Sequence, residues 1–220
     1  MTIITKPSIG LTQFTDFTMK GSTAKTKFVK DIKYQGDYHP IKDYWKALRD
    51  GLKKYHEQGL PDNYLLDMID NALPASQKNY QDVVKAYLKF LKNKNVQWFE
   101  PGKANWYSDA LTVRSNPELG LIIDDIPYLI KLYFKGKNER IDKYKCQSAL
   151  TLLKNSHYEI EHPDTIKHAI LNVQKGRLLT EDQSTDDHRI ALESDADQVM
   201  FIWNQLEPLQ PSSISQKAFI

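Results

Sequence analysis

Cysteine is nearly absent from this sequence. Cys146 is the one cysteine among 220 residues, so an internal disulfide and a cysteine-rich zinc site are both excluded. It falls within a helical pattern, where a small buried thiol is the usual state. The cysteine content therefore indicates neither a disulfide-stabilised secreted domain nor a zinc module.

Long hydrophobic runs are also missing. No apolar stretch approaches the roughly 18 residues of a membrane-spanning helix. The first residues, MTIITKPSIG, lack the apolar core and cleavage site of a signal peptide. These absences predict a cytoplasmic protein without a membrane partner.

Several familiar site motifs do not occur. The chain has no Walker loop, no GxGxxG, no GxSxG and no HExxH. The charge of the chain is close to balanced. The net charge of +2 is too small to indicate a nucleic-acid partner by itself. Residues 1–60, however, hold eleven lysines and arginines against six acidic residues. This basic third suits an anionic partner, although solvated lysines on amphipathic helices explain the same excess.

Apolar periodicity predicts helices through most of the first hundred residues. Apolar side chains recur at three- and four-residue steps in five segments: 11–19, 22–34, 40–57, one that begins at Pro61 and one after Pro74. The sequence therefore predicts a helical region over 1–95.

The period changes to that of strands after residue 100. Strands are expected at 110–114, 119–123, 126–134, 166–173 and 177–179, helices over 139–154 and 194–206, and loops over 157–164 and 181–190. The resulting order, αβββαβ, predicts an α+β fold. In it the helical region 1–95 packs on a small mixed sheet within 96–207, a C-terminal helix closes the unit, and 208–220 form a flexible tail.

A hairpin is the most specific local prediction. Asp124-Asp125 lies between two apolar strands and is typical of a two-residue turn. That turn sets the register, so that Glu118 faces Lys131 and Leu121 faces Tyr128. Alternation along the second strand then places one apolar set on one face and a set that includes Lys131 on the other.

The hairpin carries a family resemblance. Residues 116–135, NPELGLIIDDIPYLIKLYFK, resemble the PD-(D/E)XK signature of restriction-endonuclease-like nucleases. In that family an acidic residue follows a proline at the start of one strand, and the next strand carries an acidic residue and, two positions later, a lysine. Pro117-Glu118 matches the first element. Nothing matches the second element: if Lys131 is taken as the lysine, Leu129 stands where the carboxylate belongs, and if Lys135 is taken, Tyr133 does.

The resemblance covers about 80–170 and implies a nuclease-like domain whose catalytic site is eroded. In the family the carboxylates bind a divalent metal, and the lysine activates water or stabilises charge. Glu118 alone would hold Mg²⁺ poorly, so no cofactor is expected. If the protein is an enzyme, the expected class is a metal-dependent phosphodiesterase with Glu118, Lys131 and Lys135 at its site. A cross-strand ion pair of Glu118 and Lys131 explains those two residues equally well.

Three further groups invite a functional interpretation. Lys25, Lys27, Lys30 and Lys33 are expected on the exposed side of the helix over 22–34, where they would contact nucleic-acid phosphates. The stretch 96–107, VQWFEPGKANWY, would stack on single-stranded bases or form a loop that caps the core. The histidines and acids of 157–168 lack a recognised metal spacing, which favours a polar loop and no metal.

These observations lead to two main functional hypotheses. The first is a catalytically eroded nuclease-like domain that binds nucleic acid. The alternative is a structural or assembly module that binds protein through its exposed hairpin and aromatic surface. An enzyme whose site combines residues distant in the sequence is a third. The sequence indicates no oligomeric state.

Overall fold

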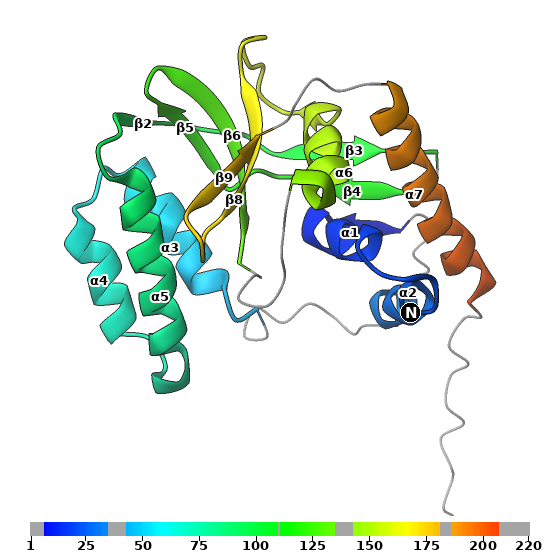
Figure 1. The fold of residues 1–220 in the computed structure, drawn as a ribbon, viewed down its shortest axis with the longest axis horizontal. Helices are drawn as coiled ribbons and strands as arrows, with labels where there is room; N and C mark the ends of the chain where they lie inside the picture. The colour runs from blue at the N-terminus through cyan, green and yellow to red at the C-terminus, as the bar shows by residue number, and fades with distance from the viewer. Residues whose placement is uncertain (1–6, 35–42, 110, 135–142, 181–185, 207–220) are drawn as a thin grey trace, which may run out of the picture.

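The computed structural model describes residues 7–34, 43–109, 111–134, 143–180 and 186–206. Within these residues seven helices and nine strands form an α+β fold, and the strands are divided between two sheets. Figure 1 shows helices on both sides of the larger sheet. The expected fold class is confirmed, whereas the expectation of a single sheet is wrong.

The larger sheet contains five strands in the order in which they occur along the chain. β2 (Val96–Phe99), β5 (Leu119–Ile123) and β6 (Ile126–Tyr133) pair antiparallel. The chain then crosses through α6 (Lys143–Lys154) to β8 (Lys167–Asn172), which is parallel to β6. β9 (Arg177–Thr180) completes the edge antiparallel to β8. A helical crossover is the usual way to join two parallel strands of one sheet.

The smaller sheet contains β1 (Ser8–Gly10), β4 (Thr112–Arg114), β3 (Ala104–Tyr107) and β7 (His157–Tyr158), in that order. β3 and β4 are an excursion of the chain between β2 and β5. The strand predicted at 110–114 is therefore outside the larger sheet, and β2, from a stretch predicted to be a loop, takes its place. With β3, β4 and β7 left to the smaller sheet, α5 (Pro74–Leu91) and the elements of the larger sheet follow one another as α5-β2-β5-β6-α6-β8, an αβββαβ order whose first strand is not the predicted one.

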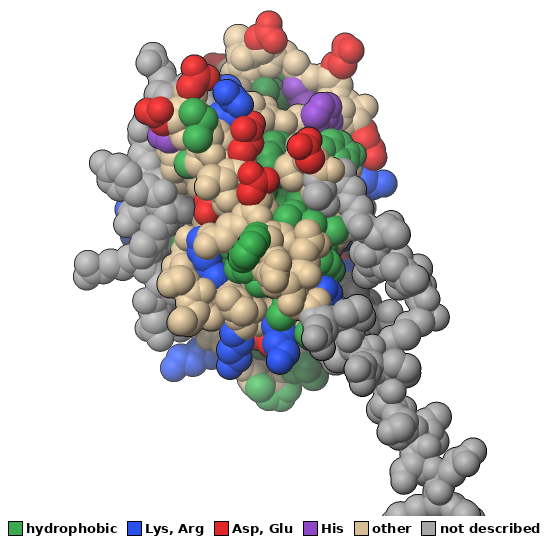
Figure 2. All heavy atoms as spheres, turned by 90° about the vertical axis from the view of Figure 1, so that its right-hand side faces the viewer, with side chains coloured by type: hydrophobic (Ala, Val, Ile, Leu, Met, Phe, Trp, Pro, Cys, Tyr) green, Lys and Arg blue, Asp and Glu red, His purple; other side chains and the backbone are tan. Residues whose placement is uncertain are grey.

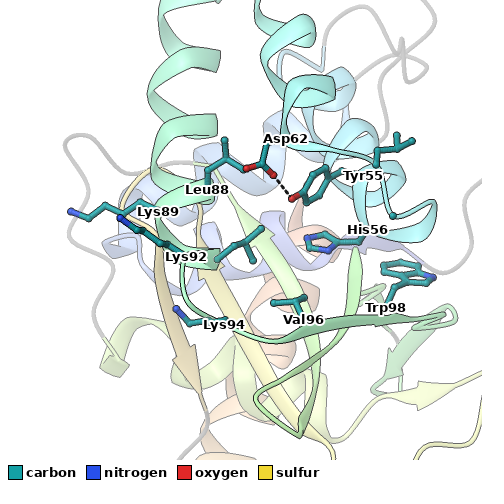
Figure 3. A pocket seen from close by; sticks show the side chains of 12 residues that line it. Tyr55, His56, Asp62, Leu88, Lys89, Lys92, Lys94, Val96 and Trp98 are labelled. Carbon is teal, nitrogen blue, oxygen red and sulfur yellow. Dashed lines mark hydrogen bonds between the residues drawn. The ribbon is translucent and has the colours of Figure 1, made fainter.

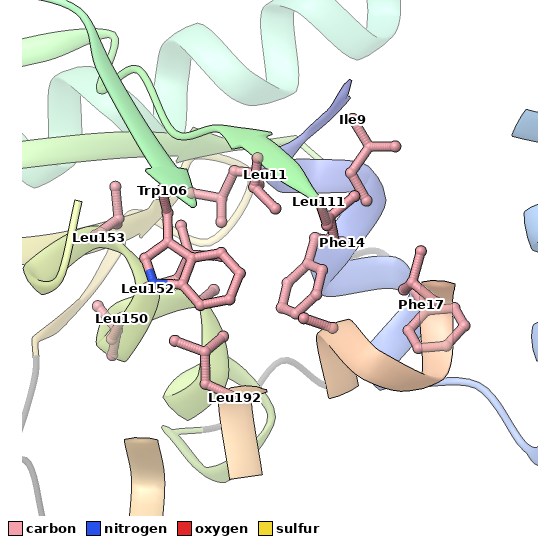
Figure 4. Packing of buried hydrophobic residues seen from close by; sticks show 14 of the residues in the cluster. Ile9, Leu11, Phe14, Phe17, Trp106, Leu111, Leu150, Leu152, Leu153 and Leu192 are labelled. Atoms are coloured by element: carbon pink, nitrogen blue, oxygen red, sulfur yellow. The ribbon is translucent and has the colours of Figure 1, made fainter. Parts of the chain in front are cut away.

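Two hydrophobic clusters cover opposite faces of the larger sheet. α3 (Lys46–Glu57), α4 (Asp62–Asp70) and α5 (Pro74–Leu91) pack on the face that carries Ile130 and Leu132. α1 (Leu11–Thr18) and α6 pack on the face that carries Tyr133 and Ile170. Figure 4 shows the second cluster, in which Trp106 of β3 is buried among residues of α1, α6 and α7. Successive side chains of β6 and β8 point to opposite faces of the sheet, so these two strands contribute to both hydrophobic clusters.

The N-terminal region does not form one helical layer. α3, α4 and α5 lie on one side of the larger sheet, while α1 and α2 (Ser22–Lys33) lie on the other side with α7 (Asp186–Gln205) (Figure 1). β1 also belongs to this region and pairs parallel to β4. The prediction of an all-helical 1–95 is wrong at β1, because pairing with a distant strand determines that segment.

The last helix begins earlier than its sequence pattern predicts. α7 starts at Asp186 within the predicted loop 181–190, and its buried residues Leu192, Ala196 and Val199 face the cluster around α1 and α6. Asp186 and Asp187 in its first turn suit the positive end of a helix, so acidity here marks a helix start. None of the described helices is both long and apolar enough to cross a membrane. The predicted tail 208–220 lies outside the described residues.

Candidate anion-binding cleft

The β5–β6 hairpin has the predicted turn and register. Asp124 and Asp125 have φ values of 48° and 66°, the left-handed pair that a type I′ turn requires. Leu121 is the partner of Tyr128, and Leu119 is the partner of Ile130. This register brings the residues just before β5 beside the C-terminal end of strand β6.

Glu118 and Lys131 are in direct contact, as the register predicts. Lys131 Nζ donates to Glu118 Oε1 at 2.6 Å and to the carbonyl of Asn116 at 3.0 Å. Glu118 Oε2 accepts the backbone N–H of Leu132 at 2.8 Å. Both side chains are largely buried, with 15% of Lys131 and 16% of Glu118 exposed. The pair therefore fastens the segment before β5 to β6.

The segment before the pair is held by its own contacts. Asn116 Oδ1 accepts the backbone N–H of Ala104 at 2.8 Å, and Pro117 is buried. Glu118 N–H donates to the carbonyl of Ile130 at 3.0 Å. The Asn-Pro-Glu element that resembles the nuclease signature thus has one defined conformation, which presents Glu118 at the start of β5.

A cleft of about 480 Å³ opens beside this pair. Its walls come from the start of α1, the start of α3, the end of β4, the segment before β5 and the end of β6. Three cationic side chains line it, Arg49, Arg114 and Lys131, against two carboxylates, Asp43 and Glu118. The lining thus carries more positive than negative charge. We call this cleft, next to the β5–β6 hairpin, the hairpin cleft.

Arg49 is held in the hairpin cleft by Asp43. Arg49 Nη2 lies 2.8 Å from Asp43 Oδ2, and each side chain is about a quarter exposed. Burial opposes the charge of Arg49, but the hydrogen bond and charge of Asp43, with Glu118 and Asp50 nearby, raise its pKa above the ordinary value. Arg49 is therefore a permanent cation in this cleft.

Arg114 supplies the third cation from the end of β4. It is exposed, and its guanidinium donates to Ser8 Oγ at 3.1 Å, a contact that neutralises no charge. Trp45, Tyr133 and Phe134 complete the cleft with aromatic surface. Trp45 stacks on Phe134 with ring centres 5.1 Å apart, which limits the movement of that wall.

The residues of the hairpin cleft do not fit a nuclease metal site. Leu129 and Tyr133, at the positions of the missing carboxylate, are buried. The two carboxylates that are present each contact a cation, Glu118 with Lys131 and Asp43 with Arg49. Across the described part of the chain, no three histidine, cysteine or acidic side chains gather as metal ligands would. Mg²⁺ has no adequate set of oxygen ligands here.

The four N-terminal lysines do not share one exposed face. Lys25 Nζ donates to Gln198 Oε1 at 2.7 Å and lies 3.6 Å from Asp195 of α7. Lys33 Nζ donates to two carbonyls at the end of α7, each at 2.7 Å. Lys27 and Lys30 are exposed. The predicted exposure is wrong for Lys25 and Lys33, because α7 packs beside α2 and supplies their partners.

The surface over α2 and α7 carries both signs of charge. Figure 2 shows Lys and Arg side chains gathered at the lower edge of this face and Asp and Glu side chains above them. A uniform basic patch is therefore not present on this face. Lys135, the remaining candidate of the sequence, lies outside the described residues.

The histidine-rich stretch after α6, residues 157–168, contacts neighbouring parts of the fold through its side chains. Its first residues form β7, and His162 Nε2 lies 3.1 Å from the carbonyl of Pro101. Tyr158 OH donates to the carbonyl of Leu153 at 2.8 Å and packs against His162 and His168. Burial, with nearby positive groups, lowers the pKa of His168 to about 4. His168 is therefore neutral at neutral pH and packs against Tyr158.

Comparison with known proteins adds no assignment: no family model, curated protein or solved structure matches this chain.

Sequence reasoning identified Glu118 and Lys131 but missed the cations that accompany them. Asp43 and Arg49 belong to a predicted amphipathic helix, and Arg114 to a predicted strand, where each is an ordinary polar residue. Only the packing of α3 and β4 around the hairpin brings them into one cleft. No spacing in the sequence signals that convergence.

Proposed function

We propose that the hairpin cleft binds the phosphate backbone of a nucleic acid without cleaving it. The observation that carries this proposal is the convergence of Arg49, Arg114 and Lys131, from three separate elements, on one cleft. Arginine is well suited to phosphate because its planar guanidinium offers two parallel N–H donors. The start of α1, at the same cleft, adds the positive end of a helix.

Binding without cleavage is supported by the state of the carboxylates. Glu118 and Asp43 are engaged by cations within hydrogen-bond distance, so they act here to hold Lys131 and Arg49. The resemblance to the PD-(D/E)XK signature and the order α5-β2-β5-β6-α6-β8 support a nuclease-like origin. In this proposal the protein acts in the cytoplasm, where its partner is DNA or RNA.

Equilibrium titration of labelled single- and double-stranded oligonucleotides tests the proposal. Affinity is expected to fall steeply between about 50 and 200 mM salt, because phosphate contacts release counterions. Arg114→Ala should reduce the slope of log affinity against log salt by about 0.7 for single strands or about 0.9 for duplex. Lys85→Ala, an equal loss of charge at an exposed position of α5, should leave the slope unchanged.

The exposed lysines of α2 provide the competing surface in the same experiment. If Lys27→Ala/Lys30→Ala abolishes salt-dependent binding and Arg114→Ala does not alter it, the hairpin cleft is not the binding site. If no oligonucleotide binds even at low salt, the nucleic-acid proposal is wrong and the protein-interaction alternative takes its place.

Incubation with plasmid DNA and with RNA in Mg²⁺ or Mn²⁺ tests the second half of the proposal. Both substrates should stay intact, since each of the two carboxylates that line the cleft is engaged by a cation. Metal-dependent cleavage that disappears in Glu118→Ala would show that the site is catalytic after all.

A further inference from the structure

A second cleft lies at the other end of α3, separate from the hairpin cleft. It has a volume of about 820 Å³ and is formed by the C-terminal ends of α3 and α5, the start of α4 and strand β2. Figure 3 shows Trp98 at one end, Lys89 and Lys92 at the other, and the side chains of Tyr55 and His56 between them. We call it the α3–α5 cleft.

Aromatic rings form one part of the α3–α5 cleft and are held in fixed positions. Tyr55 OH donates to Asp62 Oδ1 at 2.7 Å, and the Tyr55 ring meets His56 edge-on at 4.8 Å. His56 Nε2 lies 2.5 Å from the hydroxyl of buried Tyr87. Trp98 is half-buried, with Lys53 Nζ 5.8 Å from its ring centre. These contacts hold the Tyr55 and His56 rings in place, and the rings of Tyr55, His56 and Trp98 are only partly covered.

The imidazole in this cleft is neutral. Burial lowers the pKa of His56 to about 4, so at neutral pH it carries no charge. Burial, together with the hydrogen bond to Asp62, raises the pKa of Tyr55 to about 12, so this phenol keeps its proton. The two aromatic groups in the middle of the cleft are thus uncharged, with the Asp62 carboxylate beside the phenol, and they suit a flat, neutral ring that carries a hydrogen-bond donor.

The opposite end of the α3–α5 cleft is cationic. Lys89, Lys92 and Lys94 line it, whereas Asp62, the one carboxylate of the lining, lies beside Tyr55. Lys94 Nζ donates to the carbonyl of Phe90 at the end of α5, which accounts for one lysine as a helix cap. Lys89 and Lys92 are exposed and form no ion pair with any described residue. They present positive charge that the fold itself does not use.

We propose that the α3–α5 cleft binds a nucleotide unit, with the base against Trp98 and Tyr55 and the phosphate between Lys89 and Lys92. Stacking of a base on an aromatic side chain contributes about 1–3 kcal/mol, and lysines supply charge-assisted contacts to phosphate. The remaining acceptor positions of Asp62 suit an exocyclic amine of the base. The ligand is either a free nucleotide or one unit of a single strand, and the chemistry of recognition is the same.

One face of α3 connects the two clefts, which is why a single strand is considered as a ligand beside the free nucleotide. Arg49, Lys53 and His56 are spaced by four and three residues, so they share one face of the helix. Arg49 belongs to the hairpin cleft and His56 to the α3–α5 cleft, with Lys53 between them. A strand that follows this face passes from one cleft to the other.

Calorimetric titration with adenosine 5′-monophosphate, adenosine and inorganic phosphate tests the proposal directly. The monophosphate should bind more tightly than adenosine or phosphate alone, by on the order of tenfold, because only it offers a base to the aromatic side chains and a phosphate to the lysines. Lys89→Ala/Lys92→Ala should remove that advantage. Lys78→Ala/Lys85→Ala, the same charge change at exposed positions of α5 outside the cleft, should not.

A second variant tests the aromatic end. Trp98→Leu keeps apolar volume against the sheet and should weaken monophosphate binding by about 5- to 150-fold, the equivalent of the stacking energy. Its unfolding midpoint in urea reports whether the fold has survived. Equal binding of the three ligands, or monophosphate binding that Lys89→Ala/Lys92→Ala leaves unchanged, would overturn the proposal.

A single-stranded oligonucleotide separates the two ligand sources and the two clefts. If it competes with adenosine monophosphate and loses affinity in both Trp98→Leu and Arg114→Ala, the ligand is a strand that occupies both clefts. If the monophosphate binds while the oligonucleotide does not, the ligand is a free nucleotide and the function proposed for the hairpin cleft fails alone. If the oligonucleotide depends on Arg114 and not on Trp98, and the monophosphate does not bind, the α3–α5 proposal fails alone.

Discussion

The Glu118–Lys131 pair should show strong energetic coupling, because each charge depends on the other. Glu118→Gln leaves the Lys131 ammonium largely buried, with the Asn116 carbonyl at 3.0 Å as its clearest remaining partner. Lys131→Met leaves the Glu118 carboxylate with the backbone N–H of Leu132. In the double variant neither charge remains to be left unpaired, so the second substitution should add no further loss to that of the first.

The expected magnitude follows from how deeply the pair is buried. Breaking a fully buried pair costs about 3–5 kcal/mol, whereas exposed pairs are worth about 0.2–1 kcal/mol. With 15% and 16% of the side chains exposed, each single variant should lose about 2 kcal/mol of unfolding free energy. Independent effects would sum to about 4 kcal/mol, but the double variant should lose about 2, an interaction energy of about 2 kcal/mol.

Urea unfolding of the four proteins measures this coupling. A loss of about 2 kcal/mol moves the midpoint by roughly 0.7 M if the slope is about 3 kcal/mol/M, and the slope should not change. The exposed pair Arg189–Glu193, 2.9 Å apart on α7 with both side chains 51% exposed, is the matched control. Its cycle should give only about 0.3–0.5 kcal/mol. Losses at Glu118 and Lys131 that add within about 0.5 kcal/mol would refute the mutual dependence.

Three further predictions concern the frame around the clefts. Burial lowers the pKa of His168, like that of His56, from 6.5 to about 4, so the unfolded chain takes up these protons first and stability should fall as pH drops from 6.5 towards 4. The dependence of the urea midpoint on pH across this range should become shallower in His168→Asn, with His56 supplying the remainder. Gly120→Ala should cost about 1–3 kcal/mol by urea unfolding, because the new Cβ would lie 2.4 Å from the Phe99 carbonyl oxygen of the neighbouring strand, and an unchanged midpoint would contradict this close approach. Lys33→Met should cost about 1 kcal/mol in thermal or urea unfolding, since Lys33 caps the last carbonyls of α7, while Lys30→Met at an exposed position should have little effect.

Local patterns in the sequence were sufficient where the structure is determined locally. The Asp124-Asp125 turn and the alternation on either side of it predict the register that joins Glu118 to Lys131, because a two-residue turn leaves one pairing. The helices at 46–57, 62–70 and 74–91 follow from apolar residues at helical spacing, since one face of each must be buried.

The sequence did not reveal which strands share a sheet. Val96–Phe99 and Thr112–Arg114 are both short strands, and their composition alone does not show that the first pairs with β5 and the second with β1. Pairing between segments far apart depends on which faces are buried together. For the same reason the roles of Lys25 and Lys33 follow from the packing of α7 on α2, which begin more than 160 residues apart.

The sequence by itself determined the α+β class, the hairpin and its cross-strand pair, because hydrophobic period and turn chemistry act over a few residues. Only the tertiary structure decided which charges share a cleft. Arg49, Arg114 and Lys131 come together because α3, β4 and β6 all border the hairpin cleft. Tyr55, Trp98 and Lys89 line one cleft because α3, β2 and α5 all end beside it. Such convergence depends on the burial of distant faces against one sheet, and no local pattern encodes it.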